Sequence, residues 1–278
     1  MKLLRLGPRG SEKPALLAPD GSYRDLSALA SDIDRHSLAS DLASIREVDP
    51  MSLPIVDANT RIGPCVGNVG KFVCVGLNYA DHAAEGGMPV PEEPILFLKA
   101  TSAIIGPNDD VVIPRGSTKP DWEVELGIVI GKQARNVDEA DAMEHIAGFC
   151  VVNDVSERAF QHEHGGQWTK GKSADTFGPI GPWLVTRDEV PDPQNLSIWL
   201  DVDGVRQQDG STTTMVFSVR FLVHYISQFM SLQPGDIIAT GTPPGVGAGK
   251  KPPEWLKAGQ TMRLGIEGLG EQRQHVVA

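Results

Sequence analysis

The segment at residues 121–130 (DWEVELGIVI) constrains the fold most, because it is apolar, rich in β-branched residues and yet carries two glutamates. Its pattern predicts a strand. Residues two apart in a strand point to one face, so Glu123 and Glu125 should project together. Two like charges there are costly to bury unless a cation holds them, and oxygen ligands suit Mg²⁺, Mn²⁺ or Ca²⁺ rather than Zn²⁺. The alternative is that both line a solvated edge.

The composition excludes several classes of protein. The 278 residues contain 25 basic and 36 acidic residues, a formal net charge of −11, which argues against a nucleic-acid partner. Three cysteines without a CxxC pair favour a reducing compartment over a disulfide framework. No apolar run is long enough for a transmembrane helix, and the first residues turn polar too soon for a signal peptide. We therefore expect a soluble cytoplasmic protein with no membrane partner.

The element pattern predicts a small N-terminal β-rich domain, residues 1–68, and a catalytic domain, residues 69–278. The first has strands at 1–6, 14–17 and 22–25 and a helix at 41–48 that Ser40 could cap. Residues 49–70 are rich in Pro and Gly, which indicates the boundary. Beyond it we expect strands at 71–76, 94–99, 110–113, 196–202, 205–208 and 236–240, and helices at 79–85, 139–145 and 219–230. Many short strands with few helices favour a barrel or sandwich-like β architecture.

Other short motifs carry possible chemistry, and each has a simpler alternative. His82 and Glu85 would share a face of a helical turn, as a general base and its orienting carboxylate, or as an exposed helical pair. Two lysines at residues 167–179 could neutralise an oxyanion or lie on a solvated loop. The Gly-rich loop at residues 240–249 could bind an anion but lacks a P-loop arrangement. The run His162-Glu163-His164 lacks a zinc-site pattern, and we interpret it as a mobile polar loop.

In order and spacing, residues 76–85, 97–99, 121–131, 153–161, 168–176 and 240–247 resemble the fumarylacetoacetate hydrolase (FAH) family, over roughly residues 70–270. The resemblance implies a mixed α/β, mainly β fold of the FAH-type β-roll or barrel, a homodimer or dimer of dimers, and Mg²⁺ or Mn²⁺. The resemblance implies that Glu123, Glu125 and Asp154 are the metal ligands. It implies that His82, Glu85 and Lys172 are catalytic, and that Arg158, Gln161 and Thr242 bind the substrate.

Within the family, the chain looks similar to bacterial hydrolases of 2,4-diketo-3-deoxy sugar acids and to members named ureidoglycolate lyase. The resemblance therefore implies cleavage of a 2,4-diketo acid, such as 2,4-diketo-3-deoxy-L-rhamnonate or -fuconate, to pyruvate and a second acid. A lyase or an oxaloacetate decarboxylase on the same metal site is the alternative. A third interpretation is a protein that binds a metal or a small acid without catalysing a reaction. The complete set of motifs argues against it.

Overall fold

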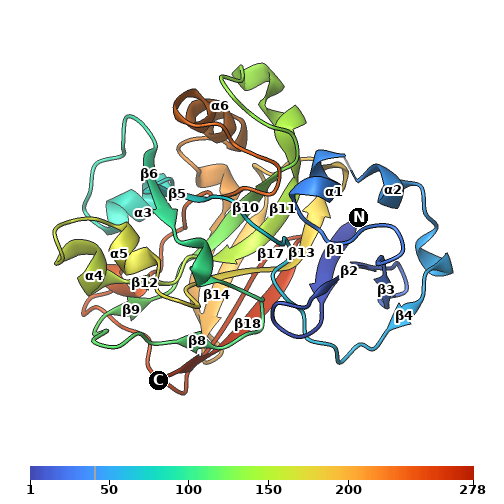
Figure 1. Ribbon diagram of the computed structural model, residues 1–278. Helices are drawn as coiled ribbons and strands as arrows, with labels where there is room; N and C mark the ends of the chain where they lie inside the picture. The colour runs from blue at the N-terminus through green and yellow to red at the C-terminus, as the bar shows by residue number, and fades with distance from the viewer. Residues whose placement is uncertain (41) are drawn as a thin grey trace.

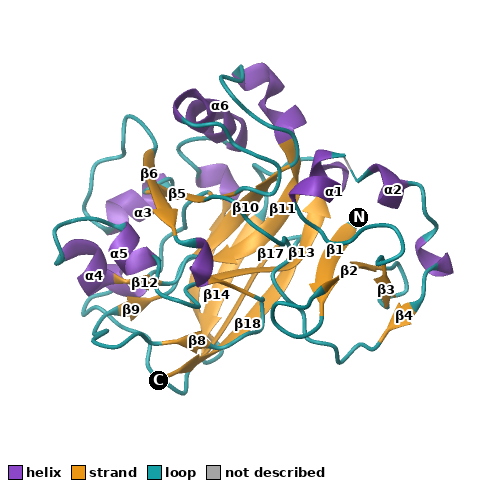
Figure 2. Ribbon diagram, viewed as in Figure 1, coloured by secondary structure: helices purple, strands orange, loops and turns teal. Residues whose placement is uncertain are grey.

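The computed structural model describes residues 1–40 and 42–278 as a mainly β structure with short helices at its periphery (Figures 1 and 2). Its strands are β1 Lys2–Leu6, β2 Lys13–Leu17, β3 Tyr23–Asp25, β4 Ile55–Val56, β5 Phe72–Gly76, β6 Ile95–Lys99, β7 Ile104–Ile105, β8 Val111–Val112, β9 Pro120–Asp121, β10 Val124–Ile130, β11 Ile146–Asn153, β12 Ser156–Glu157, β13 Gly178–Thr186, β14 Ser197–Val202, β15 Val205–Ser211, β16 Ile237–Ala239, β17 Thr261–Ile266 and β18 Gly270–Val277.

The α-helices are α1 Arg35–Ala39, α2 Ala43–Arg46, α3 Ala80–Glu85, α4 Arg158–His162, α5 Thr169–Lys172 and α6 Val219–Phe229. The 3₁₀ helices are η1 Pro50–Ser52, η2 Thr101–Ala103, η3 Glu139–His145, η4 Arg187–Glu189, η5 Thr212–Thr214 and η6 Gly247–Gly249. No helix in the described part of the chain is long and apolar enough to cross a membrane. The predicted strands and helices beyond residue 70 are present, with ends that differ by a few residues.

The large sheet is open. Its strand order is β4-β3-β2-β1-β13-β11-β10-β16-β5-β6, with β7 added beside β13. The path has two ends, so the described strands form no closed barrel, while the predicted mixed α/β, mainly β class is confirmed. A second sheet has the order β15-β14-β17-β18-β8. Figure 2 shows the strands gathered in the centre and the helices around them.

Both faces of the large sheet are buried at its centre, and every residue of β10 is buried, including Glu125. On one face, Ile128 packs in a cluster with Leu264 of the second sheet and Leu222 of α6. On the other face, Val129 packs with residues of the N-terminal segment, among them Leu38 of α1. The centre of the sheet is therefore held on both sides, and the ends of β10 and β11 have a rigid support.

The N-terminal strands continue the large sheet, because β1 pairs antiparallel with β13, with Lys2 opposite Val185. In Figure 1 this blue segment lies on the side opposite α3, α4 and α5. Residues 1–68 contain β1 to β4, and the small N-terminal β-rich domain that ends at residue 68 stays a prediction.

The predicted cap of the first helix is wrong. Asp34 caps α1, which was not predicted, and accepts hydrogen bonds from the backbone N–H groups of His36 and Ser37. Ser40 then closes the C-terminal end of α1, where its hydroxyl donates to the carbonyl of Ser37 at 2.8 Å. The next helix starts at Ala43 after Leu42. Residue 41, the predicted first helical residue, lies outside the described residues.

Candidate active site

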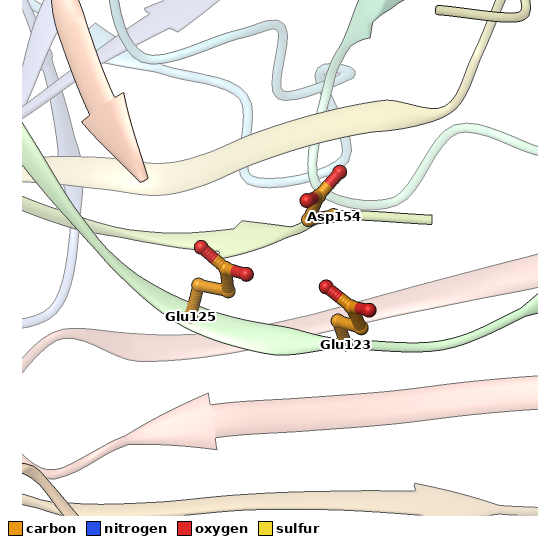
Figure 3. Close-up of side chains that lie close together, drawn as sticks. All are labelled: Glu123, Glu125 and Asp154. Carbon is orange, nitrogen blue, oxygen red and sulfur yellow. The ribbon is translucent and has the colours of Figure 1, made fainter. Parts of the chain in front are cut away.

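Three carboxylates meet where β10 begins and β11 ends (Figure 3). Val124 pairs with Asn153, and the N–H of Asp154 donates to the carbonyl of Glu123 at 2.9 Å. Glu123, Glu125 and Asp154 each offer an oxygen, and these oxygens lie within 4.8 Å of one another. Exposed fractions of 5%, 2% and 0% show that the alternative of a solvated edge is wrong. The strand itself begins at Val124, so Glu123 precedes it rather than lying inside it.

Two buried lysines hold the carboxylates together. Lys172 donates from Nζ to Glu123 Oε2 at 2.8 Å and to Asp154 Oδ2 at 2.7 Å. Lys99, at the end of β6, forms an ion pair with the other oxygen of Asp154 and donates to the carbonyl of Val155 at 3.0 Å. Lys172 was predicted for the site, whereas Lys99 was missed. A lysine that ends a strand has no local signal, because its partner is 55 positions away.

Close packing of two short helices places Lys172. The sequence predicted loops at residues 157–167 and 167–179, but the structure forms α4 and α5 there. Gly171 lies in α5 against α4, and a Cβ on it would come within 2.4 Å of the Glu157 carbonyl oxygen. Glycine is therefore required between Lys170 and Lys172, and the next residue can enter the buried cluster.

Arg158 and Asp121 form a support beneath Glu123. The guanidinium of Arg158 donates from Nε to Asp121 Oδ2 at 2.8 Å and forms an ion pair with Glu123 Oε1 at 2.6 Å. Asp121 also accepts from the N–H groups of Gly247 and Ala248, at 2.7 and 3.0 Å. Arg158, predicted to bind substrate, thus lies between two protein carboxylates. No role was predicted for Asp121, although its position two residues before Glu123 could have indicated one.

The charges of this cluster fit a cation beside Glu125. Burial, and then the nearby carboxylates Asp154 and Glu123, raise the pKa of Glu125 well above its ordinary value. Burial also opposes ionisation of Glu123, but the charges of Lys172 and Arg158 outweigh it and lower the pKa of that carboxyl. The N–H of Gly241 donates to Glu125 at 2.8 Å, yet Glu125 forms no ion pair among the described residues. The buried all-oxygen triad therefore fits a divalent cation.

The predicted dyad is present on α3. His82 Nδ1 lies 3.1 Å from Glu85 Oε2, and Glu85 also accepts from the N–H of Gly245 at 3.0 Å. A carboxylate at Nδ1 favours the tautomer with its proton on that nitrogen, which leaves Nε2 as the acceptor. The pair therefore has the arrangement of an oriented base.

A cavity of about 230 Å³ joins these groups. Its lining includes both glutamates of the triad, the dyad, Lys172, Arg158 and the three residues Gln161, His162 and Thr242. The hydroxyl of Thr242 donates to the carbonyl of Val124 at 2.8 Å and accepts from Gln208 at 2.7 Å. His162, interpreted as part of a mobile loop, instead ends α4 and faces this cavity.

Comparison with known proteins finds a matching family model, similar curated proteins and similar solved structures. A family model described as fumarylacetoacetate (FAA) hydrolase, C-terminal, matches residues 71–277. A curated protein of Burkholderia lata, provisionally named a hydrolase, is 64% identical over 99% of this chain and 98% of its own length. The structure of a fumarylacetoacetate hydrolase from Exiguobacterium antarcticum covers 100% of this chain and 99% of its own, at 34% identity and a TM-score of 0.90. A maleylpyruvate hydrolase from Sphingobium, solved with manganese(II) and pyruvate, covers the same shares at 30% identity and a TM-score of 0.83.

Proposed function

The chain belongs to the fumarylacetoacetate hydrolase family, and from that premise we propose that it hydrolyses a carbon–carbon bond of a 2,4-diketo acid. The products would be pyruvate and a second acid. One observation carries the proposal: Glu123 and Glu125 of the carboxylate triad line the same cavity as the His82–Glu85 dyad. A cation site alone would suit decarboxylation, whereas an oriented base beside it suits activation of water.

The triad would supply the electron sink. Glu123, Glu125 and Asp154 would hold Mg²⁺ or Mn²⁺, which would supply a Lewis acid that acidifies the chain beyond C2 of a 2-oxo acid. The choice of manganese is supported by the Sphingobium maleylpyruvate hydrolase, which was solved with that ion.

The dyad would activate the second reactant. His82 would accept a proton from water at Nε2 while Glu85 holds the ring through Nδ1. The oxygen of that water would add to C4, and the ammonium of Lys172 would stabilise the developing negative charge. The C3–C4 bond would then break, with its electrons passing to C3, which takes up a proton. One water enters, and pyruvate and one carboxylic acid leave.

We further propose that the natural substrate is a 2,4-diketo-3-deoxy sugar acid such as the L-rhamnonate or L-fuconate derivative. The similarity of the chain to hydrolases of that kind supports it. Ureidoglycolate lyase or oxaloacetate decarboxylase activity remains the alternative. Both reactions would use the same metal site, and neither needs water to attack a ketone.

A product assay separates these activities. We expect NMR of a 2,4-diketo-3-deoxy sugar acid with purified protein and Mg²⁺ to show pyruvate and a hydroxy acid in equal amounts. EDTA should abolish the reaction, and Glu123→Gln should remove it as well. If the folded, metal-loaded protein leaves the diketo acid intact but converts ureidoglycolate or oxaloacetate, the alternative is correct.

We also propose that the protein forms a homodimer, or a dimer of dimers, and acts in the cytoplasm. Strand β6 ends the large sheet and exposes Ile95 and Leu98, at 36% and 43%, and an exposed apolar edge strand is usually covered. The three free, buried cysteines fit a reducing compartment. Light scattering of the purified chain would measure the assembly.

A further inference from the structure

Part of the cavity wall, contributed by β6, α4 and the residue before α5, is aromatic and polar and contains no lysine, arginine or carboxylate. We define the tail wall as Phe97, Gln161, His162 and Trp168, which line the cavity together. The rings of Phe97 and Trp168 meet edge to face at 5.5 Å, and those of His162 and Trp168 at 6.1 Å. Gly76 permits this arrangement, because a Cβ there would lie 2.3 Å from the Trp168 ring.

The cationic side chains that line the cavity are already neutralised. Lys172 pairs with Glu123 and Asp154, and Arg158 pairs with Asp121 and Glu123, all at 2.6 to 2.8 Å. The lining also includes the carboxyl groups of Glu85 and Glu125, which pair with no lysine or arginine among the described residues. A second carboxylate on a substrate would therefore meet repulsion and find no free cation among the described lining residues.

The polar groups of the tail wall instead suit neutral oxygen atoms. Arg158 donates to Gln161 Oε1 at 3.1 Å, which fixes the orientation of the amide and leaves its NH₂ group as the donor. Among the described residues, that NH₂ group has no hydrogen-bond partner. His162 lies beside it, and burial and then the charge of Arg158 lower the pKa of His162. A neutral amide and a neutral imidazole offer hydrogen bonds to hydroxyl or carbonyl groups without compensating a charge.

We infer that the tail wall receives an uncharged acyl tail, alkyl or hydroxyalkyl, and discriminates against a tail that ends in a carboxylate. This inference rests on the proposed function, since it assigns the half of the substrate beyond C4. It separates this chain from its solved neighbours, whose names specify fumaryl and maleyl groups, both of which end in a carboxylate.

Binding of matched 2-oxo acids tests the inference without turnover. We expect calorimetry on the full-length, Mn²⁺-loaded protein to show 2-oxoheptanoate binding at least about tenfold more tightly than 2-oxoheptanedioate, because an unpaired buried charge costs at least that much. Equal affinity, or tighter binding of the dioate, would overturn the inference. Lys170 donates to the carbonyl of His164 in this structure. If the wild-type protein prefers the dioate and Lys170→Gln loses that preference, Lys170 is the counter-ion of the second carboxylate.

A charge placed on the tail wall should reverse the preference. His162 is exposed at the end of α4, so His162→Arg can be made without disturbing the core. We expect His162→Arg to move the affinity ratio toward the dioate by about tenfold. His162→Gln is the matched neutral control and should retain the wild-type ratio. An unchanged ratio in His162→Arg would remove this wall as the tail site.

Turnover of the corresponding diketo acids separates this inference from the proposed function. Cleavage of 2,4-dioxoheptanoate in preference to 2,4-dioxoheptanedioate supports both. Equal cleavage of the two acids retains the hydrolase and overturns the tail assignment. If neither is cleaved while 2-oxoheptanoate still binds more tightly than the dioate, the hydrolase fails and the selective wall stands.

Discussion

Lys99 and Lys172 are the side chains that allow several carboxylates to share one buried site. Together with Arg158 they provide three positive charges against Asp121, Glu123, Glu125 and Asp154. One carboxyl group is in excess, and Glu125 is the one that forms no ion pair among the described residues. A divalent cation would change the balance to one positive charge, which the carboxylate of a 2-oxo acid would neutralise. The cluster is thus suited to a cation and an anionic substrate together.

Arg158→Lys tests whether the guanidinium positions Glu123. Lysine keeps the charge but cannot contact Asp121 and Glu123 at once, as the planar fork does. We expect Mn²⁺ affinity to fall about 10- to 100-fold, as for loss of other groups that orient metal ligands. Calorimetric titration with Mn²⁺ measures it. Arg158→Met removes the charge as well and serves as the control, so its Mn²⁺ affinity should be lower still. Wild-type Mn²⁺ affinity in both variants would contradict the positioning of Glu123 by Arg158.

His82→Asn tests the base. Asparagine keeps a polar side chain of similar reach but cannot accept a proton from water, so we expect kcat to fall about 10²- to 10⁴-fold. Mn²⁺ affinity should stay unchanged, because His82 is not a member of the carboxylate triad. Steady-state rates and Mn²⁺ titration are measured on the same preparation. Near-wild-type hydrolysis by this variant would remove the dyad from the mechanism.

Sequence reasoning paired Glu123 with Glu125 and His82 with Glu85 because their signals are local, whereas Asp154 was assigned only through the family resemblance. Spacings of two and three residues indicate shared faces, and both pairs do lie together. Lys99 and Asp121 were missed because their partners are brought near only by sheet pairing. Ser40 was assigned as a cap because serine favours that position, yet Asp34 had already started a helix upstream.

At the level of elements, helices of four or five residues were the least predictable part of the fold. α4 and α5 carry little helical periodicity, since each spans barely one turn. They form because their packing at Gly171 buries Lys172 and Arg158 with the carboxylates. The strands around the site were predicted because an alternating or wholly apolar run is visible in the sequence itself.

An ion-pair cluster joins the N-terminal segment to the turn after β7. Arg61 donates to Asp109 from Nε at 2.7 Å and to Glu12 from Nη1 at 2.9 Å. Burial opposes ionisation of Asp109, but hydrogen bonding to Arg61 outweighs it, so the pKa of Asp109 is lowered. A carboxyl whose pKa is lower in the folded state stabilises the protein above its unfolded pKa. That contribution is lost as the pH falls through the folded value.

Asp109→Asn should therefore be destabilising at neutral pH and less so in acid. We expect a loss of about 1–2 kcal/mol in the free energy of unfolding at pH 7, typical of a charged hydrogen bond. The difference from wild type should shrink as the pH falls below the unfolded pKa towards the lower folded pKa of Asp109, where the wild-type carboxyl takes up a proton. Urea unfolding at each pH measures both. A difference independent of pH would show that charge is not the cause.

For the whole molecule, cation binding should depend on an anionic ligand. Lys99 and Lys172 already neutralise Asp154 and Glu123, so Mn²⁺ alone gains little. We expect Mn²⁺ with oxalate to raise Tm by about 3–6 °C, and by more than the sum of the separate effects. Thermal scans measure the shifts, with Glu125→Gln as the control that should abolish the synergy. Additive shifts in the wild-type protein would contradict this charge balance.

Tracing the oxygen of water tests the central claim, metal-dependent hydrolysis of a carbon–carbon bond, most directly. The purified protein with Mg²⁺ cleaves a 2,4-diketo acid in ¹⁸O-labelled water, and mass spectrometry follows the second acid, with a protein-free sample correcting for ketone exchange. We predict one solvent oxygen in the new carboxylate of that acid, and no reaction after EDTA. An acid without solvent oxygen, or release of CO₂ in place of a second acid, would contradict the account.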